Sequence, residues 1–126
     1  MKMVNAGECE GFKVPTPYQR EIKVIFAPDK NDVQEATLSQ VVISPSSKTN
    51  YHAHDRSEII YIISGEGICE YEEGRQLMLQ PDVALYIAPG EKHMLINNSS
   101  EPLKMITIFV PPYSKKELND RCSNCT

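Results

Sequence analysis

Hydrophobic and polar residues alternate along most of this chain with the short period of β-strands. Runs rich in apolar or β-branched residues recur from residue 21 to residue 110, and Gly, Pro, Asn and Asp separate them. Alternation with a period of two is typical of a strand that buries one face. The predicted strands are 21–26, 37–44, 58–64, 67–72, 76–80, 83–87, 92–97 and 103–110. Short strands joined by such turns predict an all-β sandwich or barrel.

The two ends of the chain lack this pattern. Glycines and prolines interrupt residues 1–21, which we expect to form an irregular lead-in. Residues 111–126 form a predicted tail, in which Ser114 and Glu117 match a capping box and favour a single helical turn. We find no internal repeat, so we expect one domain over residues 1–126, a usual length for a single core.

The charge of the chain limits its classes of partner. The 126 residues carry a formal net charge of −4, and 24% of them are charged, without a basic patch. Proteins that bind nucleic acids usually present such a patch, so we expect no nucleic-acid partner. No apolar run approaches the length of about 18 residues that a membrane span needs, and residues 1–8 lack the apolar core of a signal peptide. We therefore expect a cytoplasmic protein without a membrane partner.

The chain has four cysteines, Cys9, Cys69, Cys122 and Cys125, which would be thiols in a reducing cytosol. Cys122 and Cys125 form a Cys-x-x-Cys pair, but a structural zinc site usually needs four ligands and the chain has no second pair. We expect this pair to lie in a frayed tail, and a disulfide within the tail or to Cys9 is the alternative. Cys69 is expected to be a small core residue.

The residues best suited to chemistry lie between positions 51 and 58. His52 and His54 are two positions apart, so on a strand both imidazoles would face the same side. Glu58 keeps this parity, although a loop could intervene. Imidazole nitrogens and carboxylate oxygens are ligands for divalent metals. A fourth ligand would have to come from elsewhere, and the remaining histidine of the chain is His93.

The spacing of these residues resembles the first signature of the cupin superfamily. That signature is His-x-His, three residues, Glu, six residues and Gly, and it runs here through His52, His54, Glu58 and Gly65. Gly65 would then have a structural role in a turn. The glycine that the family places six positions before the first histidine is Ser46 in this chain.

The second cupin signature is also matched in part. It reads Pro-x-Gly, two residues, His, three residues, Asn, and Gly90, His93 and Asn97 fit it. The expected proline falls on Ala88 and the opening glycine on Asp82. These departures concern turns and strand ends and leave the ligand positions unchanged. They affect which branch of the superfamily the chain resembles. The resemblance gives Gly90 and Asn97 structural roles.

The resemblance implies a double-stranded β-helix, or jelly-roll barrel, with one divalent transition metal in its mouth. The implied ligands are His52, His54, Glu58 and His93, and iron, manganese, nickel and zinc are all compatible with them. Such a site leaves one or two positions on the metal for substrate or water.

Three functions are compatible with such a site. The first is an enzyme acting on a small molecule, as a sugar isomerase or epimerase, a lyase, a decarboxylase or a dioxygenase. The alternative is a non-catalytic sensor or carrier that binds a small molecule, and the third is a metal-free structural cupin. Arg56 could bind the carboxylate or phosphate of an anionic ligand, or it could be a solvated charge at the rim. No catalytic residue beyond the ligands can be assigned.

The same parity predicts the outer surface of the strand at 58–64. If Glu58 points inward, then Ile59, Tyr61 and Ile63 point outward. An apolar outer face needs covering, either by the N-terminal strand or by another subunit. We expect a homodimer.

Overall fold

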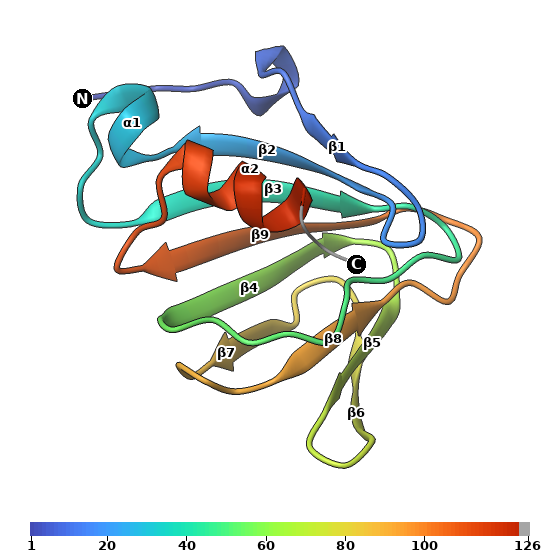
Figure 1. The fold of residues 1–126 in the computed structure, drawn as a ribbon. Helices are drawn as coiled ribbons and strands as arrows, with labels where there is room; N and C mark the ends of the chain where they lie inside the picture. Colours follow the sequence, from blue (N-terminus) through green and yellow to red (C-terminus); the bar gives the residue numbers. More distant parts are fainter. Residues whose placement is uncertain (124–126) are drawn as a thin grey trace.

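The computed structural model describes residues 1–123, and its regular structure is mostly β (Figure 1). The strands in this part of the chain are β1 (Phe12–Val14), β2 (Arg20–Phe26), β3 (Thr37–Ile43), β4 (Ser57–Ser64), β5 (Gly67–Tyr71), β6 (Arg75–Leu79), β7 (Ala84–Ile87), β8 (His93–Ile96) and β9 (Leu103–Val110). The helical elements are the short 3-10 helix η1 (Ala6–Glu8), α1 (Pro28–Asn31) and α2 (Lys115–Ser123). The all-β prediction is confirmed, and each predicted strand is present within one residue of its predicted ends.

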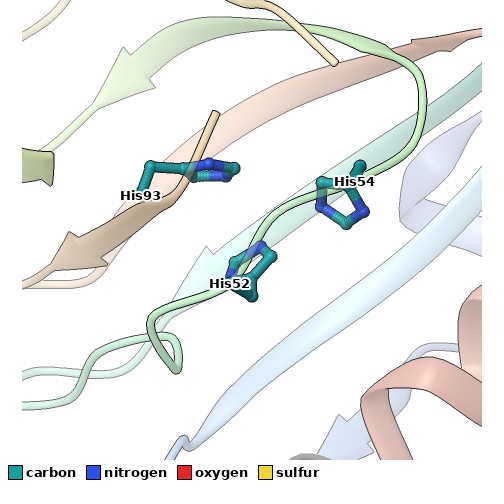
Figure 2. A group of neighbouring side chains, drawn as sticks. All are labelled: His52, His54 and His93. Atoms are coloured by element: carbon teal, nitrogen blue, oxygen red, sulfur yellow. The ribbon is translucent and has the colours of Figure 1, made fainter. Parts of the chain in front are cut away.

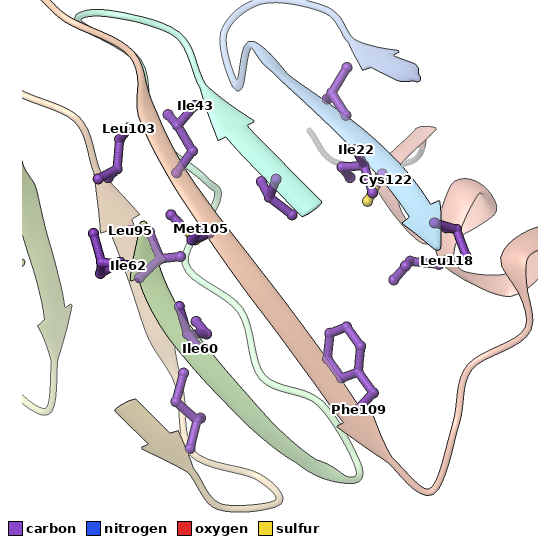
Figure 3. Packing of buried hydrophobic residues seen from close by; sticks show 14 of the residues in the cluster. Ile22, Ile43, Ile60, Ile62, Leu95, Leu103, Met105, Phe109, Leu118 and Cys122 are labelled. Atoms are coloured by element: carbon purple, nitrogen blue, oxygen red, sulfur yellow. The ribbon is translucent and has the colours of Figure 1, made fainter. Parts of the chain in front are cut away.

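The strands form two antiparallel sheets that enclose the core. The larger sheet has the order β1-β2-β3-β9-β4-β7, and the smaller has the order β6-β5-β8. Ile60, Ile62 and Met105 of the larger sheet and Cys69 and Leu95 of the smaller sheet are buried in one cluster (Figure 3). Burying each large apolar side chain contributes roughly 1.5–3 kcal/mol, which holds the two layers together.

The N-terminal lead-in is more regular than predicted. Residues 12–14 form β1, which pairs with β2. Val14 is buried and Lys13 is exposed, so this strand has the expected alternation but is only three residues long. A run that short gives too weak a pattern to be identified from the sequence.

The C-terminal tail is not frayed where the structure describes it. The Ser114 hydroxyl accepts from the Glu117 backbone N–H at 2.9 Å, and the Glu117 carboxylate accepts from the Ser114 N–H at 2.9 Å. This capping box begins a nine-residue helix rather than a single turn. Leu118 and Cys122, one helical turn apart, are both buried against the core. The prediction of a frayed tail is therefore wrong for Cys122, and Cys125 lies outside the described residues.

The outer face of β4 is open. Ile59, Tyr61 and Ile63 are 41%, 41% and 42% exposed, as parity predicts for outward positions. The N-terminal strand does not cover them, because β1 lies at the opposite edge of the larger sheet beside β2. No helix within residues 1–123 is long and apolar enough to cross a membrane.

Candidate metal centre and its cavity

Three histidines from two segments converge on one point (Figure 2). His93 opens β8, whereas His52 and His54 lie between β3 and β4, outside the named strands. The backbones of His52 and His93 exchange two hydrogen bonds, of 3.0 and 2.9 Å, and the Gly90 N–H donates to the His54 carbonyl at 2.7 Å. The histidines are therefore brought together by pairing with β8 and its preceding turn, not by the parity of a continuous strand.

The Nδ1 atom of each imidazole is held by a neighbour. His52 Nδ1 lies 2.6 Å from the Asn50 carbonyl, and His93 Nδ1 lies 2.9 Å from the Glu91 carbonyl. Both imidazoles donate from Nδ1, since a carbonyl can only accept, and this leaves Nε2 available. His54 Nδ1 lies 3.2 Å from the hydroxyl of Tyr113, a residue that follows β9 in the chain. Partners of this kind fix the orientation of metal-binding histidines.

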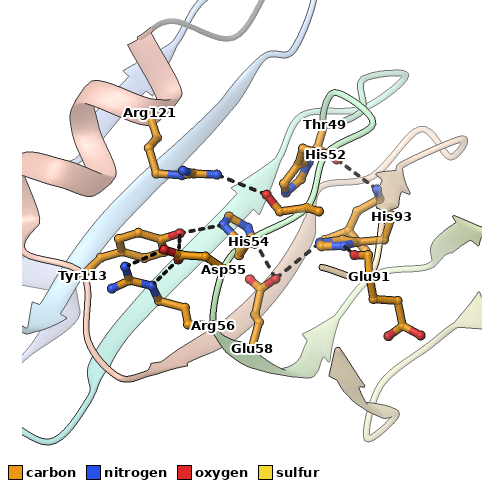
Figure 4. Close-up of polar contacts among 12 residues, drawn as sticks. Thr49, His52, His54, Asp55, Arg56, Glu58, Glu91, His93, Tyr113 and Arg121 are labelled. Carbon is orange, nitrogen blue, oxygen red and sulfur yellow. Dashed lines mark hydrogen bonds and ion pairs between the residues drawn. The ribbon is translucent and has the colours of Figure 1, made fainter. Parts of the chain in front are cut away.

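Glu58 completes the cluster from β4 (Figure 4). Its Oε1 lies 3.3 Å from His93 Nε2 and 3.8 Å from His54 Nε2. Glu58 is 6% exposed, and this oxygen has no hydrogen bond of acceptable geometry among the described residues. A buried carboxylate facing imidazole nitrogens needs a proton or a cation between them. The three histidines, with ligand atoms within 4.8 Å of one another, are positioned to bind a metal, and the Glu58 carboxylate lies beside two of them.

The protonation of the histidines supports this arrangement. Burial lowers the pKa of His52 to about 4 and that of His54 to about 3, and nearby positive charges contribute in the same direction. These two imidazoles are therefore neutral near pH 7, which is the form that binds metals. Burial also lowers the pKa of His93, but the nearby Glu58 carboxylate and the Glu91 carbonyl favour the charged imidazolium, outweigh the burial and raise that pKa above its ordinary value.

A cavity of about 360 Å³ adjoins the cluster. This volume lies at the lower end of the range for small-molecule sites. Its walls are mostly apolar and include Ile22, Met105 and Phe109. Arg20 from β2 and Arg121 from α2 also line it, and neither was identified from the sequence. Arg20 stands on the inward parity of β2, a position where a charge is unusual, but it precedes the strand predicted at 21–26, so its parity became clear only from the structure.

Arg56, which the sequence left as either an anion-binding residue or a solvated charge at the rim, does not line this cavity. Its guanidinium lies 3.7 Å from the centre of the Tyr113 ring and donates to the Asp55 carboxylate at 2.8 Å and the Pro112 carbonyl at 2.6 Å. The hydrogen bond to Asp55 raises the pKa of Arg56. Arg56 thus ties the segment that carries His54 to the chain after β9.

The remaining residues of the two signatures occupy turns and loops. Gly65 has φ +90°, and a Cβ there would lie 2.3 Å from the Pro102 carbonyl oxygen. Gly90 has φ +80° in the turn before His93, in the region that favours glycine. Asn97 is 1% exposed, and its amide contacts the end of β3 at residues 43–44 and the loop at 99–101.

Comparison with known proteins identifies the class of protein. Residues 39–109, more than half of the chain, match the cupin domain family, and the chain therefore belongs to the cupin family. It is 28% identical over 92 residues to an L-ectoine synthase of Bordetella avium, a match that covers 72% of this chain and 69% of the relative. It is 29% identical over 97 residues to an uncharacterized protein of Methanocaldococcus jannaschii, with 76% and 77% covered.

Solved structures show the same fold. Ectoine synthase from P. lautus superposes with a TM-score of 0.81 and 22% identity over 96% of this chain and 86% of that one. A predicted oxalate decarboxylase from Thermotoga maritima superposes with a TM-score of 0.78 and 17% identity over 87% and 99%. The predicted jelly-roll, or double-stranded β-helix, is confirmed, and at these identities the likeness extends to the fold alone.

Proposed function

We propose that this protein is a metal-dependent cupin enzyme that acts on a small molecule in the cavity beside its histidine cluster. His52, His54, Glu58 and His93 would hold one divalent transition metal, with iron, manganese, nickel and zinc as the candidates. The observation that carries the proposal is the buried Glu58 carboxylate, which faces the Nε2 atoms of His54 and His93 without a hydrogen-bond donor. A divalent cation would satisfy this carboxylate and the neutral imidazoles at once.

A metal bound there would supply a Lewis acid that polarises a carbonyl or hydroxyl oxygen of the substrate. The chain itself would position the imidazoles through Asn50, Glu91 and Tyr113, and its apolar walls would exclude water from the reacting groups. The relatives named L-ectoine synthase make L-ectoine the first compound to test, and the fold neighbour makes oxalate the second.

Metal content tests the ligand set. Protein purified without a histidine tag and without added metal should contain about one transition metal per chain. His93→Ala should lose most of it, and Glu58→Gln should lose less, because an amide oxygen can still coordinate. Glu66→Gln is the matched control, since Glu66 is exposed in the turn after β4. Full metal occupancy in His93→Ala would show that His93 is not a ligand, and the proposed site would then be wrong.

Turnover tests the enzyme. The metal-loaded protein should form L-ectoine from its ring-opened precursor, or convert oxalate or a related small acid, as followed by NMR, and His93→Ala should do neither. Binding of such a compound without conversion would favour the alternative, a non-catalytic binding protein.

A further inference from the structure

Two hydroxyl groups in the cavity wall have no hydrogen-bond partner within residues 1–123. Ser39 on β3 and Thr107 on β9 are 0% and 4% exposed, and both line the cavity. Neither side-chain oxygen has a hydrogen bond among the described residues. Buried hydroxyls are nearly always bonded, because burying one without a partner destabilises the fold. Alanine and valine would avoid that cost, so these hydroxyls are suited to a partner that enters the cavity, such as a water or a ligand.

The two hydroxyls are neighbours on the inner face of the larger sheet. Ser39 and Thr107 are directly opposite in the β3–β9 register. The next residues across the sheet are Val24 beside Ser39 and Ile60 beside Thr107, and both are buried. The hydroxyl pair is therefore a polar interruption in an otherwise apolar row.

This pair lies one step from the candidate metal centre. Glu58 is directly opposite Phe109, and Thr107 is two residues from Phe109 on the same face. Diagonal neighbours of this kind have Cα atoms about 7–8 Å apart. One small molecule can therefore contact the hydroxyls and the Glu58 region together, and the cavity volume of about 360 Å³ suits a ligand of that size.

The charges around the cavity select the chemistry of the ligand. Arg20 and Arg121 each carry a positive charge that an arginine keeps near neutral pH. Both arginines line the cavity. A positive potential favours anions and disfavours ammonium groups. In this field the two hydroxyls are best suited to donate to ligand oxygens.

We propose that Ser39 and Thr107 form a subsite that donates hydrogen bonds to the carboxylate of a small aliphatic acid. The other polar end of the acid reaches the candidate metal centre, and this part of the assignment rests on the proposed function. The subsite would set specificity and would take no part in metal binding.

Four compounds of equal chain length test the subsite by calorimetry on the protein as purified: succinate, 4-hydroxybutyrate, 1,4-butanediol and 1,4-diaminobutane. The two acids should bind, the diol should bind more weakly and the diamine should not bind. Ser39→Ala and Thr107→Val should each raise the Kd of the acids about tenfold, as expected for one lost hydrogen bond to a charged group. Metal content should not change in either variant.

Thermal melting distinguishes a binding role from a structural one. Thr107→Val and Ser39→Ala should melt at the same temperature as the parent or higher, because each removes an unsatisfied buried group. Thr37→Val is the matched control, since Thr37 is buried on the same face of β3 but donates to the Tyr113 carbonyl, so it should melt lower.

Unchanged acid affinity in both variants, or a diamine that binds as tightly as succinate, would overturn the subsite. If the protein binds metal but neither acid, the subsite is wrong and the proposed metal centre is still supported. Acid binding that depends on the two hydroxyls in a protein that takes up no metal would support the subsite and remove the proposed function instead.

Discussion

Replacing Asn97 with alanine should strongly destabilise the fold. Its side-chain amide donates to the carbonyls of Ile43, Ser44 and Glu101 at 3.0, 3.2 and 2.7 Å. Its carbonyl oxygen accepts from the Ser99 backbone N–H at 3.0 Å and from the Ser99 hydroxyl at 2.8 Å. One buried side chain thus joins the end of β3 to the loop before β9.

The size of the effect follows from these contacts. An amide group has two hydrogens, so its three donor contacts amount to about two full hydrogen bonds, and two more are accepted. At about 1 kcal/mol for each bond, and with water able to replace some of those at Ser99, the loss is about 3 kcal/mol. For a domain of 126 residues, this corresponds to a fall in Tm of roughly 10 °C.

Urea unfolding and thermal melting of Asn97→Ala measure this loss directly. Asn98→Ala is the control, because Asn98 is the next residue but is exposed, and it should melt within about 2 °C of the parent. Asn97→Asp should melt no higher than Asn97→Ala, since it places a buried carboxylate oxygen against the carbonyls of Ile43, Ser44 and Glu101. A melting temperature of Asn97→Ala equal to that of Asn98→Ala would refute the reasoning.

Three further outcomes are expected. Tyr61→Glu should shift sedimentation at micromolar concentration from dimer to monomer, because the open face of β4 is apolar; a monomeric parent would end the homodimer proposal. Tyr113→Phe should weaken metal affinity about tenfold in chelator competition, since it removes the partner of His54 Nδ1, and unchanged affinity would exclude this positioning role. The metal-free protein should lose stability as pH falls from 7 to 5.5. The pKa values of His52 and His54 are lowered in the folded protein, so the unfolded chain binds more protons in this range. His93, whose pKa is raised, opposes this effect. His54→Gln should reduce this dependence of stability on pH, and a melting temperature that does not change with pH would contradict the prediction.

Local pattern was enough for the strands and for the histidines. Alternation in Thr37–Ile43 and Leu103–Val110 reflects one buried face, and each predicted strand was found within one residue of its ends. The resemblance of the spacing of His52, His54, Glu58 and His93 to the cupin signatures implied one cluster. The capping box at Ser114 correctly marked the start of a helix, although the helix proved longer than one turn.

Two sequence signals were present but were not used. Ser39 and Thr107 stand at inward positions of strands whose other inward residues include Val41 and Met105. Arg20 also interrupts the apolar side of β2, but it precedes the strand predicted at 21–26, so only the structure showed this. A polar residue at an inward position costs stability, so it often marks a site of function.

What only the tertiary structure decided is which distant segments meet. The expectation that His52 and His54 lie on a strand was replaced by a loop paired to β8, because long-range hydrogen bonds to His93 and Gly90 set their geometry. Helix α2 brings Arg121 and Cys122 to the cavity, and the polar sequence of the tail gave no sign of this. Strand parity and ligand spacing are local properties that a sequence records directly. The partner of a loop or of a terminal helix depends on how the two sheets pack, which is settled by burial summed over the whole chain.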